Sequence, residues 1–308
     1  MDTSDLQTLI ALADEKSFHG AANRLGLTQP AITRRLQRLE DRIGTLLFDR
    51  TTKPLQPTLA GQRALAEARD LLRRLDGFGD VITGATTPTG PVRFGISHGV
   101  APLVSAPELR KLHDRFPDIA LSIRSGWSSE LLPLLRRGEI DALLALDPPN
   151  GGATAAAMIP AFRLDHVLDD DIVVIGPASD PTPPRDVTEL ARHPLILMPD
   201  GCLFRAKGNA LAQRHGVRFA SVLEVSALEL QIDMIAAGAG YGIMARRYCL
   251  HSPTRDRIRI LDLPGARWPM AISMIRRPAA GEIDAVIDAL ATIVIEAGNC
   301  KNAQKLSA

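Results

Sequence analysis

The residues of this sequence best suited to chemistry are the polar and basic side chains of one predicted helix, which could contact nucleic acid. Apolar residues recur there at Ile32, Leu36, Leu39 and Ile43, with the spacing of one face of an α-helix. The residues that project away from this face are Pro30, Ala31, Arg34, Gln37, Arg38 and Arg42. Side chains near the N-terminus of such a helix can contact base edges in a major groove, while arginines behind them bind phosphates. The same arginines also fit an ordinary solvated helix face, so the helix alone does not decide between the two.

The segment before this helix predicts a helix-turn-helix. Ser17 can cap a first helix, and Gly26 can close it in the left-handed conformation that glycine adopts at little cost. Thr28 can cap the second helix, where Pro30 lies in the first turn and removes no backbone hydrogen bond. A further helix, capped by Ser4 and extending to about residue 15, is expected to pack behind these two.

Two short extended segments around a polar turn follow within residues 46–57 and predict the hairpin of a wing. Arg50 and Lys53 lie where a wing would contact backbone phosphate or a minor groove. Between Arg24 and Lys53 the sequence has seven basic residues against three acidic ones, which makes a local basic patch. The candidate DNA contacts are Gln29, Pro30, Ala31, Thr33 and Arg34 toward the bases, and Arg35, Arg38, Arg50 and Lys53 toward the phosphates.

The order of these elements, and the residue types at fixed spacing within them, resemble the LysR-type transcriptional regulators. The resemblance covers about the first sixty residues, and it is highly specific because many positions match at fixed spacing. It is carried by Ser17-Phe18, Ala21-Ala22, Leu25, Gln29-Pro30-Ala31, Leu36, Leu39-Glu40, Gly44, Leu47-Phe48, Arg50, Thr58 and Gly61. The resemblance implies a homodimer, assembled further into a homotetramer, with an effector domain of the periplasmic-binding-protein type.

A long helix is predicted from residue 58 to about residue 81. Leu65, Ala68, Leu72 and Leu75 alternate spacings of three and four along it, which is typical of a coiled-coil seam. The pattern itself fits pairing with a second copy and packing on a core equally well. The resemblance favours dimerisation, which would place two recognition helices on successive major-groove faces of one pseudo-palindromic site.

Residues 83–91 consist almost entirely of turn and linker residues, so we place a domain boundary there. Beyond it, strand and helix patterns alternate and predict a largely parallel sheet, with a second lobe that begins with a strand at 171–176. Strands at 258–263 and 270–275 are expected to return to the first lobe. The predicted fold class is α/β, with a winged helix-turn-helix DNA-binding domain (1–60), a dimerising linker helix (58–86), a two-lobed effector-binding domain (91–299) and a tail (300–308).

Three loops that follow predicted strands form the candidate effector site. In open α/β sheets ligands bind beyond the carboxyl ends of strands, where helix N-termini favour anions. Serines in these loops can hydrogen-bond a carboxylate and apolar side chains can form walls, although the same residues fit helix caps and core positions. The resemblance implies that these loops hold the effector. The candidates are Ser97, His98, Trp127, Ser128, Ser129, Met198, Pro199, Cys202 and Phe204.

Catalytic and metal-binding motifs do not account for the sequence. It contains no HExxH, no Walker-type phosphate loop and no GxSxG. Three consecutive acids, Asp169–Asp171, are expected in a solvated loop rather than around one ion. The peroxide-sensing branch of the family relies on a second cysteine a short distance downstream, whereas the next cysteine after Cys202 is Cys249. We therefore expect no enzymatic activity, no metal and no cofactor.

Composition and charge are those of an ordinary soluble globular protein. The chain has 308 residues, of which 45% are hydrophobic and 23% charged. Its net charge is only +1, so attraction to DNA must come from clustered arginines. Three widely separated cysteines favour a reducing compartment, and no signal peptide or membrane-spanning run is recognisable. These features predict a cytoplasmic protein.

The sequence as a whole predicts a transcriptional regulator that binds double-stranded DNA and responds to a small-molecule effector of unknown identity. The alternative, from another class, is a small-molecule-binding or enzymatic α/β protein whose N-terminal helices serve only assembly. No membrane partner is expected.

Overall fold

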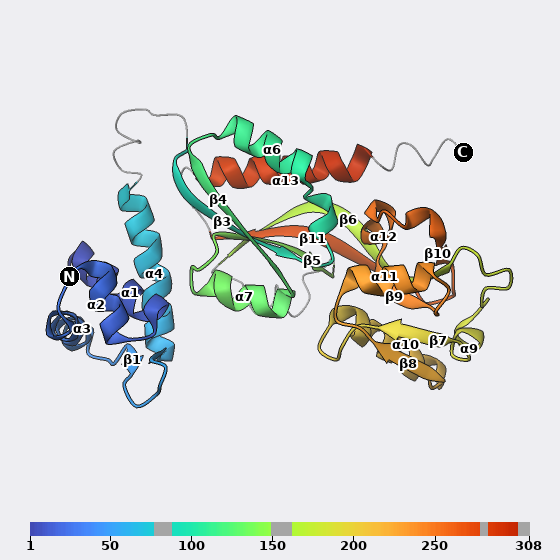
Figure 1. The fold of residues 1–308 in the computed structure, drawn as a ribbon, viewed down its shortest axis with the longest axis horizontal. Coiled ribbons are helices and arrows are strands. Elements are labelled where there is room, and N and C mark those ends of the chain that lie inside the picture. The colour runs from blue at the N-terminus through green and yellow to red at the C-terminus, as the bar shows by residue number, and fades with distance from the viewer. Residues whose placement is uncertain (77–87, 149–161, 278–282, 301–308) are drawn as a thin grey trace.

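The computed structural model describes residues 1–76, 88–148, 162–277 and 283–300. Within these ranges, the N-terminal part forms a small helical unit with a hairpin, followed by a long helix (Figure 1). Its elements are α1 (Thr3–Glu15), α2 (Phe18–Leu25), α3 (Gln29–Ile43), β1 (Phe48–Asp49), β2 (Gln56–Pro57) and α4 (Leu59–Asp76). Helices α2 and α3 form the predicted helix-turn-helix, and the antiparallel pair β1 and β2 forms the predicted wing.

The turn between α2 and α3 has the predicted caps with one exception. Ser17 Oγ accepts a hydrogen bond from Gly20 N at 3.0 Å, and Gly26 lies in the left-handed region at φ +63°. Thr28 is the N-cap residue of α3, as predicted, but its side chain makes no capping hydrogen bond. The turn is therefore fixed by the glycine and by the serine cap of α2.

The apolar faces of the N-terminal helices form one core, to which α3 contributes Ile32, Leu36 and Leu39. Ile43, the fourth residue of the predicted stripe, is 46% exposed because it lies at the end of α3, where the chain turns away. The predicted cap of the first helix was wrong. Asp2 caps α1 in place of Ser4, because Asp2 Oδ1 accepts a hydrogen bond from Asp5 N at 3.1 Å.

Helix α4 packs on this core with its first half. Leu65 and Ala68, from the predicted seam, are buried in the core, so they are not available for a second copy. Leu71 and Leu75 are 47% and 53% exposed and form an apolar surface farther along the helix. The last part of the predicted helix, residues 77–81, lies outside the described residues.

The C-terminal part is built on a seven-stranded mixed sheet with the order β10-β6-β11-β5-β3-β4, in which β9 also pairs with β6. The strands are β3 (Gly90–Ser97), β4 (Ile119–Gly126), β5 (Ala142–Asp147), β6 (Arg163–Pro177), β9 (Gly242–Ala245), β10 (Ile258–Leu261) and β11 (Trp268–Arg276). Strand β3 runs parallel to β4 and β5, as predicted. The expectation of a largely parallel sheet was wrong for the rest, because β11 enters between β5 and β6 antiparallel to both.

Helices cover both faces of this sheet (Figure 1). Helices α6 (Ala106–Arg115) and α13 (Ile283–Cys300) lie on one face, and α7 (Ser128–Arg136) lies on the other. A short 3-10 turn, Ala101–Leu103, precedes α6. Leu131 and Leu135 anchor α7 against Leu143 and Ile275 of the sheet. No helix in the described ranges is both long and apolar enough to cross a membrane.

The second lobe adds a smaller parallel pair, β7 (Pro194–Leu197) and β8 (Ser221–Glu224). Its other elements are α9 (Val187–Leu190), α10 (Leu203–His215), α11 (Leu228–Ala236), α12 (Arg246–His251) and the 3-10 turn Arg255–Arg257. Strand β10 pairs with residues 174–177 of β6 in this lobe. The prediction that β10 returns to the first lobe was therefore wrong, whereas β11 does return and pairs with β5.

Strand β6 is a single strand of 15 residues that joins the lobes. Its first part pairs with β11, and its last part pairs with β9 and β10. The solvated loop predicted at Asp169–Asp171 was wrong, since these residues lie inside β6. Asp170 is 7% exposed and accepts a hydrogen bond from Arg247 N at 3.1 Å. Burial raises the pKa of its carboxyl group to about 6.

Candidate functional site

The first turns of α3 are exposed to solvent, and the wing contacts the helix farther along, where Arg50 donates to Gln37 and Glu40. The exposed candidates for base contacts are Gln29, Pro30, Thr33 and Arg34. Ala31 and Arg35 are half-buried, and Lys53 is exposed on the wing. Thr33 Oγ1 donates a hydrogen bond to Gln29 O at 3.0 Å. The N-terminal end of α3 thus presents the polar side chains that a major-groove helix needs.

Arg38 has an intramolecular partner that the sequence analysis did not assign. Its Nη2 donates a hydrogen bond to Asp5 Oδ1 of α1 at 2.7 Å. Asp5 is 3% exposed, whereas the Arg38 side chain is 63% exposed. The pair ties α3 to α1, and a contact between Arg38 and a phosphate has to use its other N–H groups.

Arg50 also pairs with a buried carboxylate. Its Nη2 donates to Glu40 Oε2 at 2.6 Å, and Glu40 is 2% exposed. The other oxygen, Glu40 Oε1, accepts from Leu47 N at 2.8 Å, so Glu40 fixes the start of the wing. From the sequence, Glu40 was part of the family resemblance and was not assigned a structural role. Its spacing from Ile32 and Leu36 places it on the buried face of α3, and this was the available signal.

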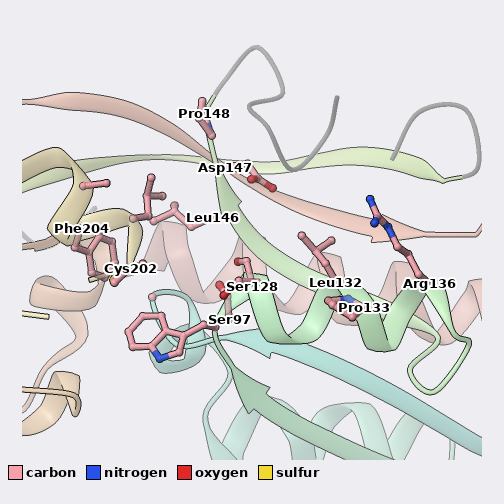
Figure 2. Close-up of a pocket in the computed structure, with 16 residues that line it drawn as sticks. Ser97, Ser128, Leu132, Pro133, Arg136, Leu146, Asp147, Pro148, Cys202 and Phe204 are labelled. Atoms are coloured by element: carbon pink, nitrogen blue, oxygen red, sulfur yellow. The ribbon is translucent and has the colours of Figure 1, made fainter. Parts of the chain in front are cut away.

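A cavity of about 580 Å³ lies between the carboxyl ends of β3 and β5 and the beginning of α10 (Figure 2). Helix α7 forms one wall along its length. The volume is in the range of small-molecule binding sites, and such a position is where α/β sheets bind ligands. The cavity is lined by these residues among the sequence candidates: Ser97, Trp127, Ser128, Ser129, Cys202 and Phe204.

The polar groups of the cavity gather near the N-terminus of α7. Ser97 is 5% exposed, and its Oγ has no hydrogen-bond partner among the described residues. An unpaired buried hydroxyl costs about 1–3 kcal/mol, so Ser97 Oγ is suited to a hydrogen bond with water or a ligand in the cavity. Ser128 and Ser129 begin α7, where backbone N–H groups favour a negative charge. Glu130 Oε2 accepts one of these hydrogen bonds, from Trp127 N at 3.0 Å.

Other residues of the cavity were missed by the sequence analysis. They are Leu132, Pro133 and Arg136 on α7, and Leu146, Asp147 and Pro148 at the end of β5. Ligands bind beyond the carboxyl ends of parallel strands, and this rule, applied to β5, would have found Leu146, Asp147 and Pro148. The first group follows Ser128 and Ser129 at helical spacing on the same face of α7. The cavity therefore contains both a carboxylate and a guanidinium group.

Three sequence candidates do not line this cavity. His98 is turned toward β4, where its Nδ1 lies 3.1 Å from Ser125 Oγ and its ring packs edge-on against Trp127 at 4.8 Å between centroids. Side chains alternate along an extended chain, so His98 points away from the side that Ser97 faces. Met198 is fully buried in the core, and Pro199 lies in the turn before α10.

Cys202 lies at the cavity just before the first turn of α10 and is buried. Burial raises the pKa of its thiol, and the N–H groups of Phe204 and Arg205 lower it by less. Cys249 is fully buried in α12, and burial raises the pKa of that thiol strongly. A raised pKa disfavours the thiolate form of both cysteines.

Known protein families match nearly the whole chain. Residues 3–62 match the family described as bacterial regulatory helix-turn-helix protein, lysR family. Residues 85–297 match the LysR substrate binding domain. The second match alone covers more than half of the sequence, and both fall on the parts that the structure separates.

Individual relatives agree with these family matches. A probable hydrogen peroxide-inducible genes activator from Mycobacterium avium is 27% identical over 285 residues, 91% of this chain and 89% of that protein. The structure of ArgP from Mycobacterium tuberculosis has the same fold, with a TM-score of 0.74 at 18% identity over 96% of this chain and 97% of that one. Full-length CbnR in complex with its target DNA has a TM-score of 0.56 at 22% identity, over 96% of this chain and 100% of that one. The chain belongs to the LysR-type transcriptional regulators, which are DNA-binding proteins with an effector-binding domain.

Proposed function

We propose that the protein reads its DNA site with the first turns of α3 and holds the DNA backbone with arginines and the wing. The observation that carries the proposal is the exposure of Gln29, Pro30, Thr33 and Arg34 at the N-terminal end of α3. Base edges are contacted by the N-terminal residues of a recognition helix, and phosphates by basic side chains around it. Ala31 fits close approach to a base, and Arg35, Arg38, Arg50 and Lys53 are the proposed phosphate contacts.

Replacing Arg34 with alanine is expected to weaken binding to the specific site roughly ten- to hundredfold and to relax the preference at one base pair. The reason is that an arginine donates two hydrogen bonds to one guanine, which no other base accepts in the same way. Binding of the full-length variant to a set of single-base-pair variants of the site would measure this. Arg63, which is exposed on α4 and outside the proposed DNA contacts, supplies a control substitution. An equal loss of affinity for all DNA sequences would mean that Arg34 contacts the DNA phosphate backbone and not a base.

We propose that the cavity binds the effector, a small molecule with an apolar body and a carboxylate. The serine hydroxyls and the N-terminus of α7 offer donors to the carboxylate, while Trp127 and Phe204 offer apolar walls. His98 supports the ring of Trp127 from behind. Met198 and Pro199 were candidates from the sequence but do not line this cavity, and we propose them only as part of the loop that leads to Cys202.

Replacing Ser97 with alanine tests this assignment in two ways, and the stability measurement needs no effector. If the hydroxyl is kept for a ligand, removing an unpaired buried polar atom should leave the protein equally stable or raise the free energy of unfolding by about 1 kcal/mol. Affinity for the effector should fall roughly tenfold. Urea unfolding followed by tryptophan fluorescence reports on this part, because Trp127 and Trp268 both lie in it. A clear loss of stability would mean that the hydroxyl has a structural role.

Peroxide sensing, which the name of one relative indicates, is not supported by the cysteines of this chain. Burial raises the pKa of both Cys202 and Cys249, and no other cysteine follows Cys202 closely. We expect hydrogen peroxide to leave DNA binding unchanged, and a thiol-alkylating reagent to modify folded protein far more slowly than unfolded protein. A peroxide response that the variant Cys202→Ser abolishes would contradict this.

The remaining parts of the proposal concern assembly and setting. We propose a homodimer paired through α4, whose exposed Leu71 and Leu75 suit a second copy, and a homotetramer built from two dimers. The proposed division is 1–60 for DNA binding, 58–86 for the linker helix and 91–299 for the effector domain.

We propose that the protein is cytoplasmic, where its DNA is, and has no enzymatic role. Groups of three or more His, Cys, Asp or Glu side chains suited to a metal are absent from the described residues.

The experiment that tests the whole proposal is selection of DNA fragments from the source genome with purified full-length protein at several salt concentrations. We expect enrichment of one pseudo-palindromic site, and the genes beside it would indicate the chemistry of the effector. Binding that is sensitive to salt but blind to sequence would refute the proposal and favour a small-molecule-binding protein whose N-terminal helices serve assembly.

A further inference from the structure

Helix α7 lines the cavity, and the residue at its C-terminal cap, Arg137, contacts the linker helix α4. The side chains of Ser128, Ser129, Leu132, Pro133 and Arg136 line the cavity over the whole length of α7 (Figure 2). The opposite side of the helix is anchored to the sheet by Leu131 and Leu135. The residues directly after α7 lie against helix α4. One short helix therefore spans the distance between a bound ligand and the linker helix.

Two arginines bind the last carbonyl groups of α7. Arg277, at the end of β11, donates from Nη2 to Arg136 O at 3.1 Å. Arg69, on α4, donates from Nη1 to Arg137 O at 2.7 Å. Carbonyl groups at a helix C-terminus lack partners within the helix and carry partial negative charge, so cations stabilise them. One of the two cations belongs to the effector domain, and the other comes from the linker helix.

Arg69 continues this connection into the helix-turn-helix. Its side chain is only 8% exposed, and its Nη2 donates to Asp14 Oδ1 of α1 at 2.5 Å. The other oxygen, Asp14 Oδ2, accepts from Arg24 Nη1 of α2 at 2.8 Å. A second ion pair, between Glu67 of α4 and Arg277, spans 3.7 Å beside it. A continuous series of hydrogen bonds thus runs from α7 to α2.

The turn after α7 fits closely against α4. Gly138 has a φ of +67°, and a Cβ atom there would lie 3.5 Å from the Cβ and Cδ atoms of Arg69. This close approach keeps the Arg137 carbonyl in reach of the guanidinium group. A shift of the turn by an ångström or more would lengthen the hydrogen bond beyond its normal range.

Helix α7 lacks one backbone hydrogen bond between its two ends. Pro133 has no N–H group, so the hydrogen bond that this position would donate to Ser129 O is missing. Both residues line the cavity. Proline inside a helix is a common cause of bending, so a ligand seated against the first turn can move that turn relative to the last.

We infer that Arg69 and the C-terminal end of α7 form the contact through which a ligand in the cavity controls the position of the DNA-binding part. This inference rests on the proposed function, in which the cavity holds the effector. A ligand that changes the bend of α7 changes the distance from the Arg137 carbonyl to Arg69. Arg69 then transmits the change to Asp14 and Arg24. The coupling is reciprocal, so DNA bound to the helix-turn-helix acts on α7 by the same route.

Hydrogen exchange of the full-length protein tests the contact without DNA or effector. In the variant Arg69→Gln, the amides of residues 134–139 should exchange roughly tenfold faster, because the C-terminal end of α7 loses a charged partner. The control Arg63→Gln, an exposed residue on the same helix, should leave their exchange unchanged. Faster exchange confined to α1 and α4 would show that Arg69 only stabilises the DNA-binding part, and would overturn the inference.

The reciprocal variant covers the case in which Arg69→Gln does not fold. Arg277→Gln removes the partner of Arg136 O and of Glu67 from the effector side. We expect faster exchange across residues 60–70 of α4, which lie in the other part of the chain. Unchanged exchange in those residues would overturn the inference as well.

Hydrogen exchange in the presence of DNA distinguishes a failure of this inference from a failure of the proposed function. With the genomic fragment that the selection enriches, wild-type protein should show slower exchange at residues 134–139, whereas Arg69→Gln should bind the fragment without that change. Equal protection in both proteins would overturn the coupling while leaving DNA recognition intact. If wild-type protein enriches no fragment, the proposed function fails, and the exchange of the free variants still decides whether the contact exists.

Discussion

Replacing Glu40 with alanine should lower the free energy of unfolding of the DNA-binding part by about 3 kcal/mol. The Glu40 carboxylate is 2% exposed and accepts hydrogen bonds from Leu47 N and from Arg50 Nη2. Its removal leaves a buried N–H group without a partner and releases Arg50 from the wing. Glu40→Gln keeps the acceptor for Leu47 N but loses the charge, so a smaller effect is expected.

Urea unfolding with two probes measures this effect. Circular dichroism follows all helices, whereas the fluorescence of Trp127 and Trp268 follows only the effector domain. We expect Glu40→Ala to shift part of the dichroism transition and to leave the fluorescence transition in place. Asp41→Ala is the matched control, because Asp41 is exposed and follows Glu40 directly. Equal effects of the two substitutions would show that the buried carboxylate is not a structural anchor of the wing.

Gly61→Ala should be comparably damaging, at about 3 kcal/mol, and should also abolish specific DNA binding. A Cβ atom at position 61 would lie 1.8 Å from the carbonyl oxygen of Leu47. This obstacle is backbone, and it cannot turn aside as a flexible side chain can. The Leu47 carbonyl is itself held by Thr58 N at 3.0 Å, so α4 would have to move away from the wing.

The same two-probe unfolding experiment applies to Gly61→Ala, with Gln62→Ala as control. Gln62 is exposed on the next position of α4, and alanine there should change stability by less than about 0.5 kcal/mol. A loss of DNA affinity with unchanged stability would assign Gly61 to DNA contact rather than to packing. Gly61 is one of the residues that carry the resemblance to the family, and this close approach is a physical reason for a glycine there.

The partners of Arg50 and Arg38 could not be predicted from the sequence. Both were predicted as phosphate contacts from their charge and position, yet each is bound to a buried carboxylate, Glu40 or Asp5. Asp5 lies 33 residues before Arg38, a separation at which no spacing rule operates. The cost of burying these carboxylates is offset by the arginines, which are therefore part of the structure before they meet DNA.

The sequence by itself determined the features that depend on neighbours along the chain. The serine cap of α2, the left-handed Gly26 and the apolar face of α3 were predicted because caps, turns and helical periodicity act over a few residues. The parallel β3, β4 and β5, and the part of the cavity at their carboxyl ends, followed from the alternating order of strands and helices, because a helix between two strands returns the chain to pair in parallel.

Tertiary structure alone decided which distant groups meet. The antiparallel insertion of β11, the burial of Asp170 within β6 and the contact of Arg69 with the end of α7 join residues that are far apart in the chain. Their free energy comes from burial, hydrogen bonds and charge pairing at short distance, and these quantities depend on the folded path of the chain. Periodicity and composition record none of these distances, so the partners of Arg69 could be found only in the folded protein.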